Sequence, residues 1–296
     1  MATQTAARTE VVVSRPASRV ARRAGGQLLV YVVLVVLGVA VALPFLAALS
    51  TALKEPGTAY EYPPRWIPRS IALSNFTAVF AYIPFVTFLR NSLIVTTLAM
   101  TGEMLSASLV AYGFARFRFP GRNVLFVIVL ATMMIPYPVT IVPSFILFRE
   151  LGWLNSIKPL TVPAFLGPAF SVFLLRQFFL TISRDLDDAA KLDGASELRI
   201  FWEIILPLSK PALATVAVFS FVANWNDFLG PLIYLNEMDK FTLALGINFL
   251  RAARGESTDI VIQMAGTILY LLPCIVLLIA AQRYFVEGIV TTGMME

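Results

Sequence analysis

Long apolar runs alternate with short polar stretches along this chain of 296 residues. A helix that crosses the hydrocarbon core of a membrane needs about 20 mostly apolar residues. Six runs reach that length. The pattern therefore predicts an all-α, polytopic membrane protein with six transmembrane helices, at about 28–53, 85–114, 124–148, 160–179, 211–235 and 261–284.

The third and fourth of these runs are the ones most interrupted by proline and glycine. Proline removes a backbone donor and clashes with the preceding turn, but membrane helices tolerate it where neighbours satisfy the freed carbonyls. The third run is expected to be kinked or broken, because it contains Pro136, Pro138 and Pro143. The fourth run is the least regular, since it contains Pro163, Gly167 and Pro168.

One polar segment, at about 183–208, has the pattern of two short helices joined by a sharp turn. In its first half, Asp187 and Lys191 are spaced so that they can pair on one side of a helix. The same helix has an apolar side formed by Leu186, Ala189 and Ala190. Gly194 can adopt the left-handed conformation that ends a helix, and Ser196 can cap the next one.

The second half of this segment has an apolar stripe of its own. Arg199 and Glu203 fall on the opposite side, and Pro207 ends the pattern. The whole segment is therefore predicted to be a helix-turn-helix, and its apolar stripe consists of Leu198, Phe201, Ile205 and Leu208.

Composition excludes several classes of function. The chain is 58% hydrophobic and 14% charged, whereas soluble domains have about 25% charged residues. It has no His and one Cys, Cys274, which excludes histidine-based catalysis, a usual zinc site and an intrachain disulfide. No phosphate-binding Gly-x-x-x-x-Gly-Lys-Ser/Thr sequence occurs. We expect no enzyme activity, no catalytic residues, no metal and no cofactor.

The net charge of +5 is better explained by membrane topology than by nucleic-acid binding. Cytoplasmic loops carry an excess of Lys and Arg. With both termini in the cytoplasm, 14 of the 23 Lys and Arg residues lie on the cytoplasmic side. This orientation also places the helix-turn-helix in the cytoplasm.

Three regions follow from this topology. Residues 1–27 form a flexible basic cytoplasmic arm, residues 28–284 form the six-helix transmembrane domain, and residues 285–296 form a cytoplasmic tail. The outer loop at 54–84 contains Tyr60, Tyr62, Trp66 and Tyr82, which favours an interfacial helix there rather than a folded domain.

The helix-turn-helix resembles the cytoplasmic motif of bacterial ABC-importer permeases: Glu-Ala-Ala, three residues, Gly, nine residues, Ile-x-Leu-Pro. Asp188 replaces the usual Glu and keeps its charge with a shorter reach. Three flanking stretches, 173–179, 225–232 and 282–286, resemble the carbohydrate-importer permeases of the MalG type. The resemblance covers about residues 28–290, and the motif positions matched are Ala189, Ala190, Gly194, Ile204, Leu206 and Pro207.

The resemblance implies a permease of the bacterial inner membrane. It also implies four kinds of protein and solute partner: a second homologous permease, two cytoplasmic ABC ATPase subunits, an extracytoplasmic solute-binding protein and a carbohydrate substrate. Membrane lipid surrounds the complex, and ATP hydrolysis belongs to the ATPase subunits. Asp188 and Asp193 are candidates for contact with the ATPase, and Gly194 is needed for the turn.

Candidates for the translocation path are fewer. Glu103 lies in the middle of the second run, where a carboxylate is costly in lipid and faces the protein interior or a wet cavity. A helix–helix hydrogen bond explains it equally well. Asn224, Asn226 and Asp227 cluster beside Trp225 and Phe228, as polar groups do in sugar sites, although Asn also holds membrane helices together.

Three other functions stay open at this point. The permease could serve a non-sugar solute such as a glycerophosphodiester, a polyol or a peptide. An ion-coupled secondary transporter would need ionisable relays and an inverted repeat, for which Glu103 and Asp227 are thin support. A membrane enzyme is disfavoured, because no acid–base pair is recognisable.

Overall fold

The computed structural model describes residues 17–63, 65–252 and 260–293, and every regular element in those ranges is helical. The bundle comprises α1 (Ala17–Ala52), α2 (Ser74–Tyr82), α3 (Phe85–Arg116), α4 (Arg122–Thr132), α5 (Tyr137–Glu150), α6 (Lys158–Thr161), η1 (Val162–Leu166), α7 (Ala169–Thr181), α11 (Lys210–Trp225), α12 (Leu229–Tyr234), η3 (Met238–Lys240), α13 (Leu243–Ala252) and α14 (Ile260–Gly293). Between α7 and α11 lie α8 (Asp185–Leu192), α9 (Glu197–Ile200), η2 (Phe201–Ile205) and α10 (Leu206–Leu208).

Four spans among the described residues are long and apolar enough to cross a membrane: Leu29–Ala52, Phe85–Arg116, Lys158–Thr181 and Ile260–Gln282. The number rises to six when two bent helix pairs are each counted as one span. One pair is α4 with α5, which meet at 95° in the proline-rich third run. The predicted break in that run is therefore confirmed.

The other bent pair differs from the prediction. Helix α11 ends at Trp225 instead of continuing to residue 235, and it pairs with the segment Glu197–Leu208 at 79°. Pro231 has no N–H to bond the carbonyl four residues earlier, so a continuous helix through this point is disfavoured. The chain instead starts the separate short helix α12.

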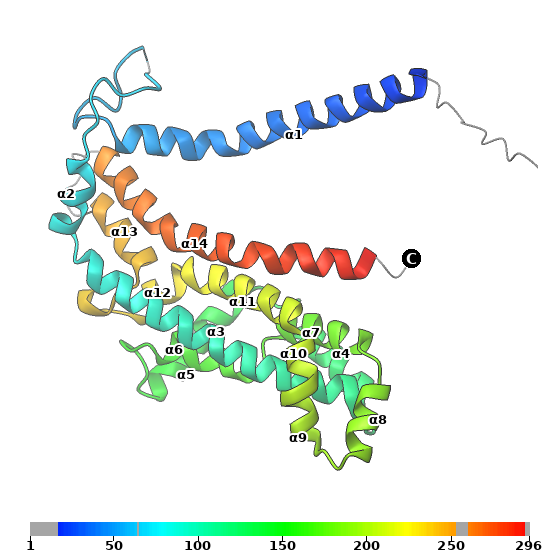
Figure 1. Cartoon of the computed structure of the whole chain (residues 1–296). Coiled ribbons are helices and arrows are strands. Elements are labelled where there is room, and N and C mark those ends of the chain that lie inside the picture. Colours follow the sequence, from blue (N-terminus) through cyan, green and yellow to red (C-terminus); the bar gives the residue numbers. More distant parts are fainter. Residues whose placement is uncertain (1–16, 64, 253–259, 294–296) are drawn as a thin grey trace, which may run out of the picture.

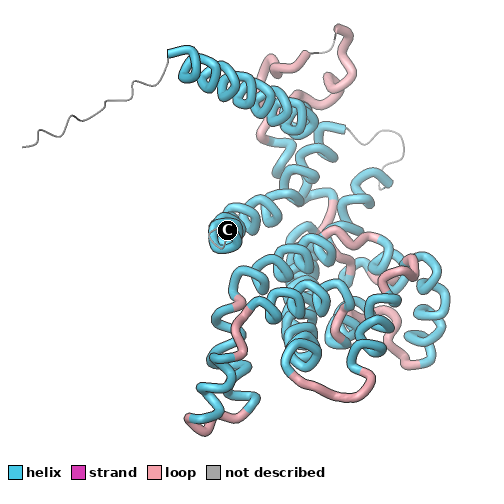
Figure 2. Tube along the Cα trace, turned by 90° about the vertical axis from the view of Figure 1, so that its right-hand side faces the viewer, coloured by secondary structure: helices cyan, strands magenta, loops and turns pink. Residues whose placement is uncertain are grey.

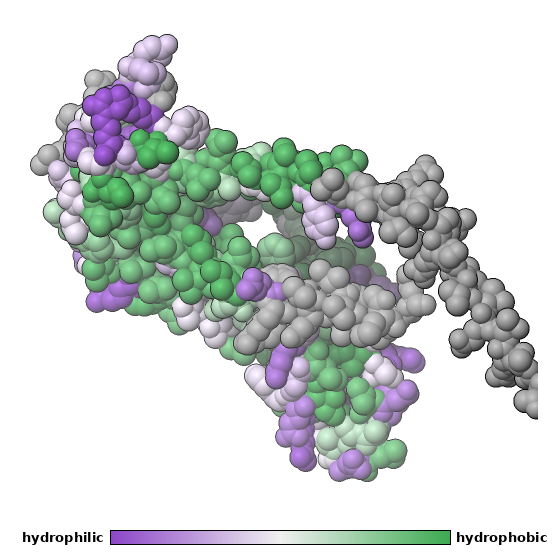
Figure 3. Space-filling model, turned by 45° about the horizontal axis from the view of Figure 1, so that its top comes forward, coloured by the Kyte–Doolittle hydropathy of each residue, from purple (hydrophilic) through white to green (hydrophobic). Residues whose placement is uncertain are grey.

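The helices run between two ends of an elongated bundle (Figure 1). The start of α1, the end of α14 and the pair α8–α9 lie at one end, while the loop after α1 and helix α2 lie at the other (Figure 1). Figure 3 shows hydrophobic surface between these ends and hydrophilic residues at both. This arrangement fits a protein embedded in a membrane.

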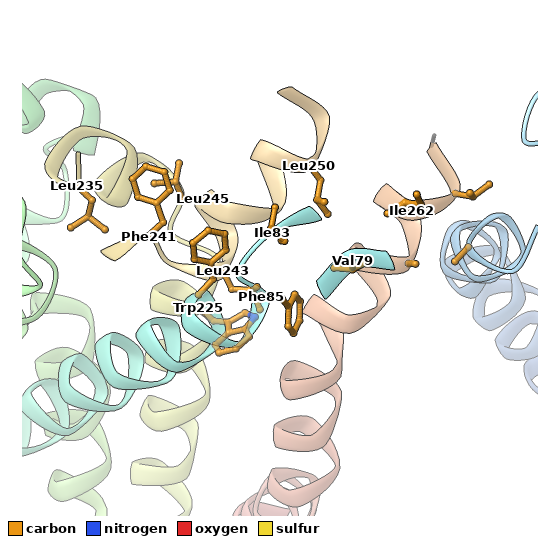
Figure 4. Packing of buried hydrophobic residues seen from close by; sticks show 14 residues of the cluster. Val79, Ile83, Phe85, Trp225, Leu235, Phe241, Leu243, Leu245, Leu250 and Ile262 are labelled. Atoms are coloured by element: carbon orange, nitrogen blue, oxygen red, sulfur yellow. The ribbon is translucent and has the colours of Figure 1, made fainter. Parts of the chain in front are cut away.

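Two buried apolar clusters hold the bundle together. The first joins α2, α3, α11, α13 and α14 and includes Val79, Phe85 and Trp225 (Figure 4). The second joins α3 and α7 to the segment after α8 through Ala111, Leu175, Phe179, Phe201 and Ile205. Because Phe201 and Ile205 are packed in this cluster, it anchors the helix-turn-helix to the bundle.

The structure differs from the predicted regions at the start of α1, at the end of α14 and in one helix that was not predicted. Helix α1 begins at Ala17, inside the region expected to be a flexible arm, and residues 1–16 lie outside the described residues. Helix α14 continues to Gly293, through most of the expected tail. Helix α13 was not predicted, because an amphipathic helix of only 10 residues is too short to be recognised as a membrane span. The outer loop contains the helix α2, and its position at the membrane interface stays a prediction.

Candidate functional site

The first candidate site is the helix-turn-helix, called here the coupling segment (α8, α9, η2 and α10). Gly194 has φ +82°, which confirms the predicted left-handed turn. The N–H of Gly194 donates to the Lys191 carbonyl (3.0 Å), and the N–H of Ala195 donates to the Ala190 carbonyl (2.9 Å). These two bonds form a Schellman motif, which satisfies the carbonyls at the end of α8. Ser196 caps α9 by accepting from the N–H of Arg199 (3.3 Å), as expected.

The coupling segment has an exposed tip and a buried root. Asp188, Ala189, Asp193 and Gly194 are exposed at the tip, where Leu192 is 90% exposed. At the root Ile204 and Leu206 pack partly buried against the second apolar cluster, while Pro207 is exposed. The motif residues therefore divide into a surface group and an anchoring group. Figure 2 shows this segment projecting from the bundle.

The predicted apolar stripe of the second helix is only half buried. Phe201 and Ile205 are buried, whereas Leu198 is 66% exposed and Leu208 is 48% exposed. The π-helical turn of η2 changes the angular spacing that a regular helix would give to Leu208, whereas Leu198 precedes that turn and lies at the exposed tip. The helix also bends at Ser209, two residues after Pro207, where the Ser209 hydroxyl donates to the Ile205 carbonyl (2.7 Å).

The expected pairing of Asp187 with Lys191 is wrong. Asp187 turns into the protein and pairs with Arg116 of α3 (Oδ2–Nε 3.1 Å), while Lys191 pairs with Glu197 of α9 (2.7 Å). Burial raises the pKa of Asp187, and the Arg116 guanidinium opposes that rise. The Glu197 carboxylate raises the pKa of Lys191. The sequence could not reveal these partners, because they come from separate elements.

The second candidate site lies in the middle of the bundle. Glu103 of α3 accepts from the hydroxyls of Ser171 on α7 and Ser220 on α11, the latter at 2.5 Å. Asn224 donates to the Ser220 carbonyl (2.8 Å) and hydroxyl (3.3 Å). Glu103 thus joins three helices, which favours the helix–helix hydrogen-bond interpretation over a free position in the path. The two serines were not predicted, because nothing in their local sequence distinguishes them.

Beside this centre is a pocket of about 500 Å³, lined by Tyr137, Ser144, Phe148, Pro159, Leu160, Pro163, Ala223, Asn224, Asp227 and Tyr234. Of the three predicted polar residues, Asn224 in the last turn of α11 and Asp227 just beyond its end line the pocket. Asp227 also accepts from the N–H of Gly230 (3.0 Å) and so caps α12. Asn226 lies elsewhere: it donates to the Val222 carbonyl (2.8 Å) and accepts from the Tyr270 hydroxyl (2.6 Å).

Among the described residues, no group of His, Cys, Asp and Glu side chains could hold a metal ion. What remains is a partly open pocket with polar and aromatic walls beside α11 and an exposed helical segment at one end. Residues 104–290, which include the coupling segment and the pocket, match the family described as binding-protein-dependent transport system inner membrane component. The chain belongs to this family of permeases. The ion-coupled secondary transporter and the membrane enzyme are therefore rejected as alternatives.

Relatives of this permease have different substrates in their names. It is 35% identical over 227 residues to the arabinooligosaccharides transport system permease protein AraQ of Halalkalibacterium halodurans, covering 76% of this chain and 80% of that one. It is 34% identical over 264 residues to the sn-glycerol-3-phosphate transport system permease protein UgpE of Salmonella typhi, covering 87% and 94%.

The fold of the permease is shared with a solved transporter. A chain from the crystal structure of a bacterial ABC transporter involved in the import of the acidic polysaccharide alginate superposes with a TM-score of 0.78. The superposition covers 92% of this chain and 99% of that chain, at 23% identity. At this level of identity the similarity shows a shared fold, which is that of an ABC-transporter permease.

Proposed function

We propose that this chain is the transmembrane permease subunit of an ATP-driven ABC importer for an uncharged carbohydrate. The pocket beside α11 carries this proposal. It combines the aromatic rings of Tyr137, Phe148 and Tyr234 with the polar side chains of Asn224 and Asp227. Flat apolar faces and a few hydrogen-bonding groups are what a polyhydroxylated ring needs from a site.

A phosphorylated solute is the alternative, since one group of relatives is named for sn-glycerol-3-phosphate. Phosphate recognition uses Arg or Lys, or backbone N–H groups at the start of a helix. No Lys or Arg is among the described residues that line the pocket, and its charged side chain is the carboxylic acid of Asp227. The charge of this surface therefore supports a neutral solute over a phosphate ester.

The coupling segment is proposed to dock on a cytoplasmic ATPase subunit. Its exposed tip has the acidic side chains of Asp188 and Asp193 together with apolar Leu192 and Leu198, a combination that suits a protein interface. The start of α1 and the end of α14 lie at the same end of the bundle (Figure 1). Both termini are accordingly proposed to be cytoplasmic, on the side of the ATPase.

The remaining partners are proposed from the family and from exposed surface. The family name includes a binding protein, which would deliver the solute at the opposite end from the coupling segment. Large apolar side chains of α1 between Leu29 and Leu43 are exposed in this chain. A second homologous permease and membrane lipid are proposed to cover them, because such a surface is unstable in water.

The test uses the complex purified with its binding protein and reconstituted in vesicles. Uptake of labelled arabinooligosaccharide and of labelled sn-glycerol-3-phosphate is measured for the wild type and for Asn224→Ala. We expect uptake of the neutral sugar only, with a raised apparent KM in the variant. Asn226→Ala is the matched control, because Asn226 lies outside the pocket; it should alter the yield of the complex but not the KM. Uptake of the phosphate ester alone would refute the carbohydrate proposal.

A further inference from the structure

Helix α3 is attached to both halves of the coupling segment by polar side chains at its cytoplasmic end. Arg116 forms an ion pair with Asp187 of α8 (3.1 Å), and its Nη1 donates to the Ile182 carbonyl (3.1 Å). One turn earlier, the hydroxyl of Tyr112 donates to Oε2 of Glu197 on α9 (3.0 Å). Arg116 and Tyr112 lie on one face of α3, since they are four residues apart.

The ion pair between Arg116 and Asp187 differs from the other ion pairs of the chain. Its side chains are 4% and 9% exposed, whereas both members of each of the four other described ion pairs are at least 38% exposed. A buried ion pair contributes little net stability compared with apolar packing, because both charges lose their hydration. Its best-attested role is to fix one relative orientation of two elements. Here the elements are α3 and α8.

A second contact reinforces this orientation. The carboxylate of Glu197 bonds Tyr112 through Oε2 and pairs with Lys191 of α8 through Oε1 (2.7 Å). Both halves of the helix-turn-helix are thereby joined to each other and to α3. The coupling segment can then move as one body only if the cytoplasmic end of α3 moves with it.

The opposite end of α3 is also fixed by hydrogen bonds. Asn91 donates to the carbonyls of Asp239 (2.7 Å) and Phe241 (3.0 Å), and the Ser92 hydroxyl accepts from the N–H of Leu243 (2.7 Å). Between the two ends, Glu103 ties α3 to α7 and α11. A helix of 32 residues is about 48 Å long. One rigid helix therefore connects the coupling segment, the middle of the bundle and the loop before α13.

We propose that α3 transmits the movement of the coupling segment to the outer end of the permease, with Arg116, Asp187, Tyr112 and Glu197 as the positioning residues that attach it. The inference rests on the proposed docking of the coupling segment on an ATPase. It assigns these residues a role in coupling that is separate from folding and from contact with the ATPase.

The experiment measures movement at the end of α3 that lies away from the coupling segment. Val86, exposed in the first turn of α3, is replaced by Cys and labelled with an environment-sensitive fluorophore, in a chain carrying Cys274→Ser. The full complex is purified through a tag on this chain. ATP hydrolysis and the change in emission with ATP and orthovanadate are measured together, so that ATPase activity and movement are read separately.

In the wild type we expect ATP hydrolysis and a change in emission. Asp187→Asn and Tyr112→Phe should each reduce the change in emission by about threefold or more while hydrolysis continues. Asp187→Glu keeps the charge and should restore much of the response. Arg118→Gln is the control, because it removes a charge from an exposed position two residues beyond Arg116.

The outcomes separate the inference from the proposed function. A wild-type complex without an ATPase, or without ATP hydrolysis, would contradict the proposed function and the inference with it. A hydrolysing complex in which Asp187→Asn and Tyr112→Phe respond like the wild type would overturn the inference alone. If Asp187→Asn does not assemble, Tyr112→Phe decides, since it removes one hydroxyl and keeps the ring packed against Phe201.

Discussion

At the scale of single residues, Glu103 shows how a structure resolves an ambiguity that sequence leaves open. A carboxylate in the middle of an apolar helix indicates either a wet path or a buried hydrogen bond. The hydroxyls of Ser171 and Ser220 occupy both of its oxygens. These serines are 68 and 117 residues away along the chain, so no local pattern could identify them.

This arrangement predicts a stability effect for Glu103→Ala. The change removes two hydrogen bonds and leaves two hydroxyls to find new partners, at a cost of about 1–3 kcal/mol for each unsatisfied group. We expect a lower Tm of the detergent-solubilised protein, followed by its intrinsic tryptophan fluorescence. Ser108→Ala is the control, because the Ser108 hydroxyl bonds only within its own helix, at the Leu105 carbonyl (3.0 Å). An unchanged Tm with lost transport would favour the path interpretation instead.

At the scale of elements, close packing of α3 depends on small residues that hydropathy does not distinguish. Gly102 and Gly113 both lie inside α3, but their surroundings differ. A Cβ on Gly102 would overlap the ring of Phe165 in η1, whereas a Cβ on Gly113 would have no neighbour within 4 Å. The two positions form a matched pair within one helix.

Substitution of these two glycines should have opposite effects. Gly102→Ala forces the Phe165 ring or η1 to shift, and overpacking of this kind costs about 1–3 kcal/mol. Gly113→Ala should be neutral or stabilising by up to about 1 kcal/mol, because Ala is the better helix former. Thermal unfolding of both variants in the same detergent tests this. Equal Tm values for the two variants would show that α3 and η1 are not closely packed.

Helix positions were largely predictable from the sequence, because membrane spans follow from apolar length alone. The break between α4 and α5 was predictable from the three prolines of that run, because proline removes a backbone donor. The end of α11 at Trp225, the π-helical turn of η2 and the short helix α13 were not. None of these is visible in a hydropathy profile: α11 ends ahead of Pro231, and the bond from the Gly230 N–H to Asp227 lies at the start of the separate helix α12.

At the scale of the whole molecule, the coupling segment projects from one end of the bundle (Figure 1). It exposes both charged and apolar side chains. The sequence predicted its turn correctly, because left-handed backbone at Gly194 is a local property. It did not predict the attachment of the segment to α3, which depends on the three-dimensional arrangement of Arg116 and Asp187. The local sequence pattern and the tertiary contacts together distinguish the exposed tip of the segment from its buried root.

The docking proposal predicts which substitutions release the ATPase. Gly194→Val strains the turn by about 1 kcal/mol or more, because a branched side chain disfavours φ +82°. Asp188→Ala removes an exposed carboxylate and leaves the turn intact. With a tag on this chain, we expect each variant to recover less ATPase from gentle detergent extracts than the wild type, as measured by mass spectrometry, with the second permease retained.

The variant Gly121→Val is the control that distinguishes a loss of docking from an effect of backbone strain. Gly121 has φ +76° and, like Gly194, no atom within 4 Å of an added Cβ, but it lies in the loop before α4. The Gly121→Val variant therefore has a similar backbone strain outside the coupling segment, and it should recover a normal amount of ATPase. If all three variants lose the ATPase equally, general destabilisation explains the loss. If Gly194→Val and Asp188→Ala recover as much ATPase as the wild type, the tip of the coupling segment is not the docking site.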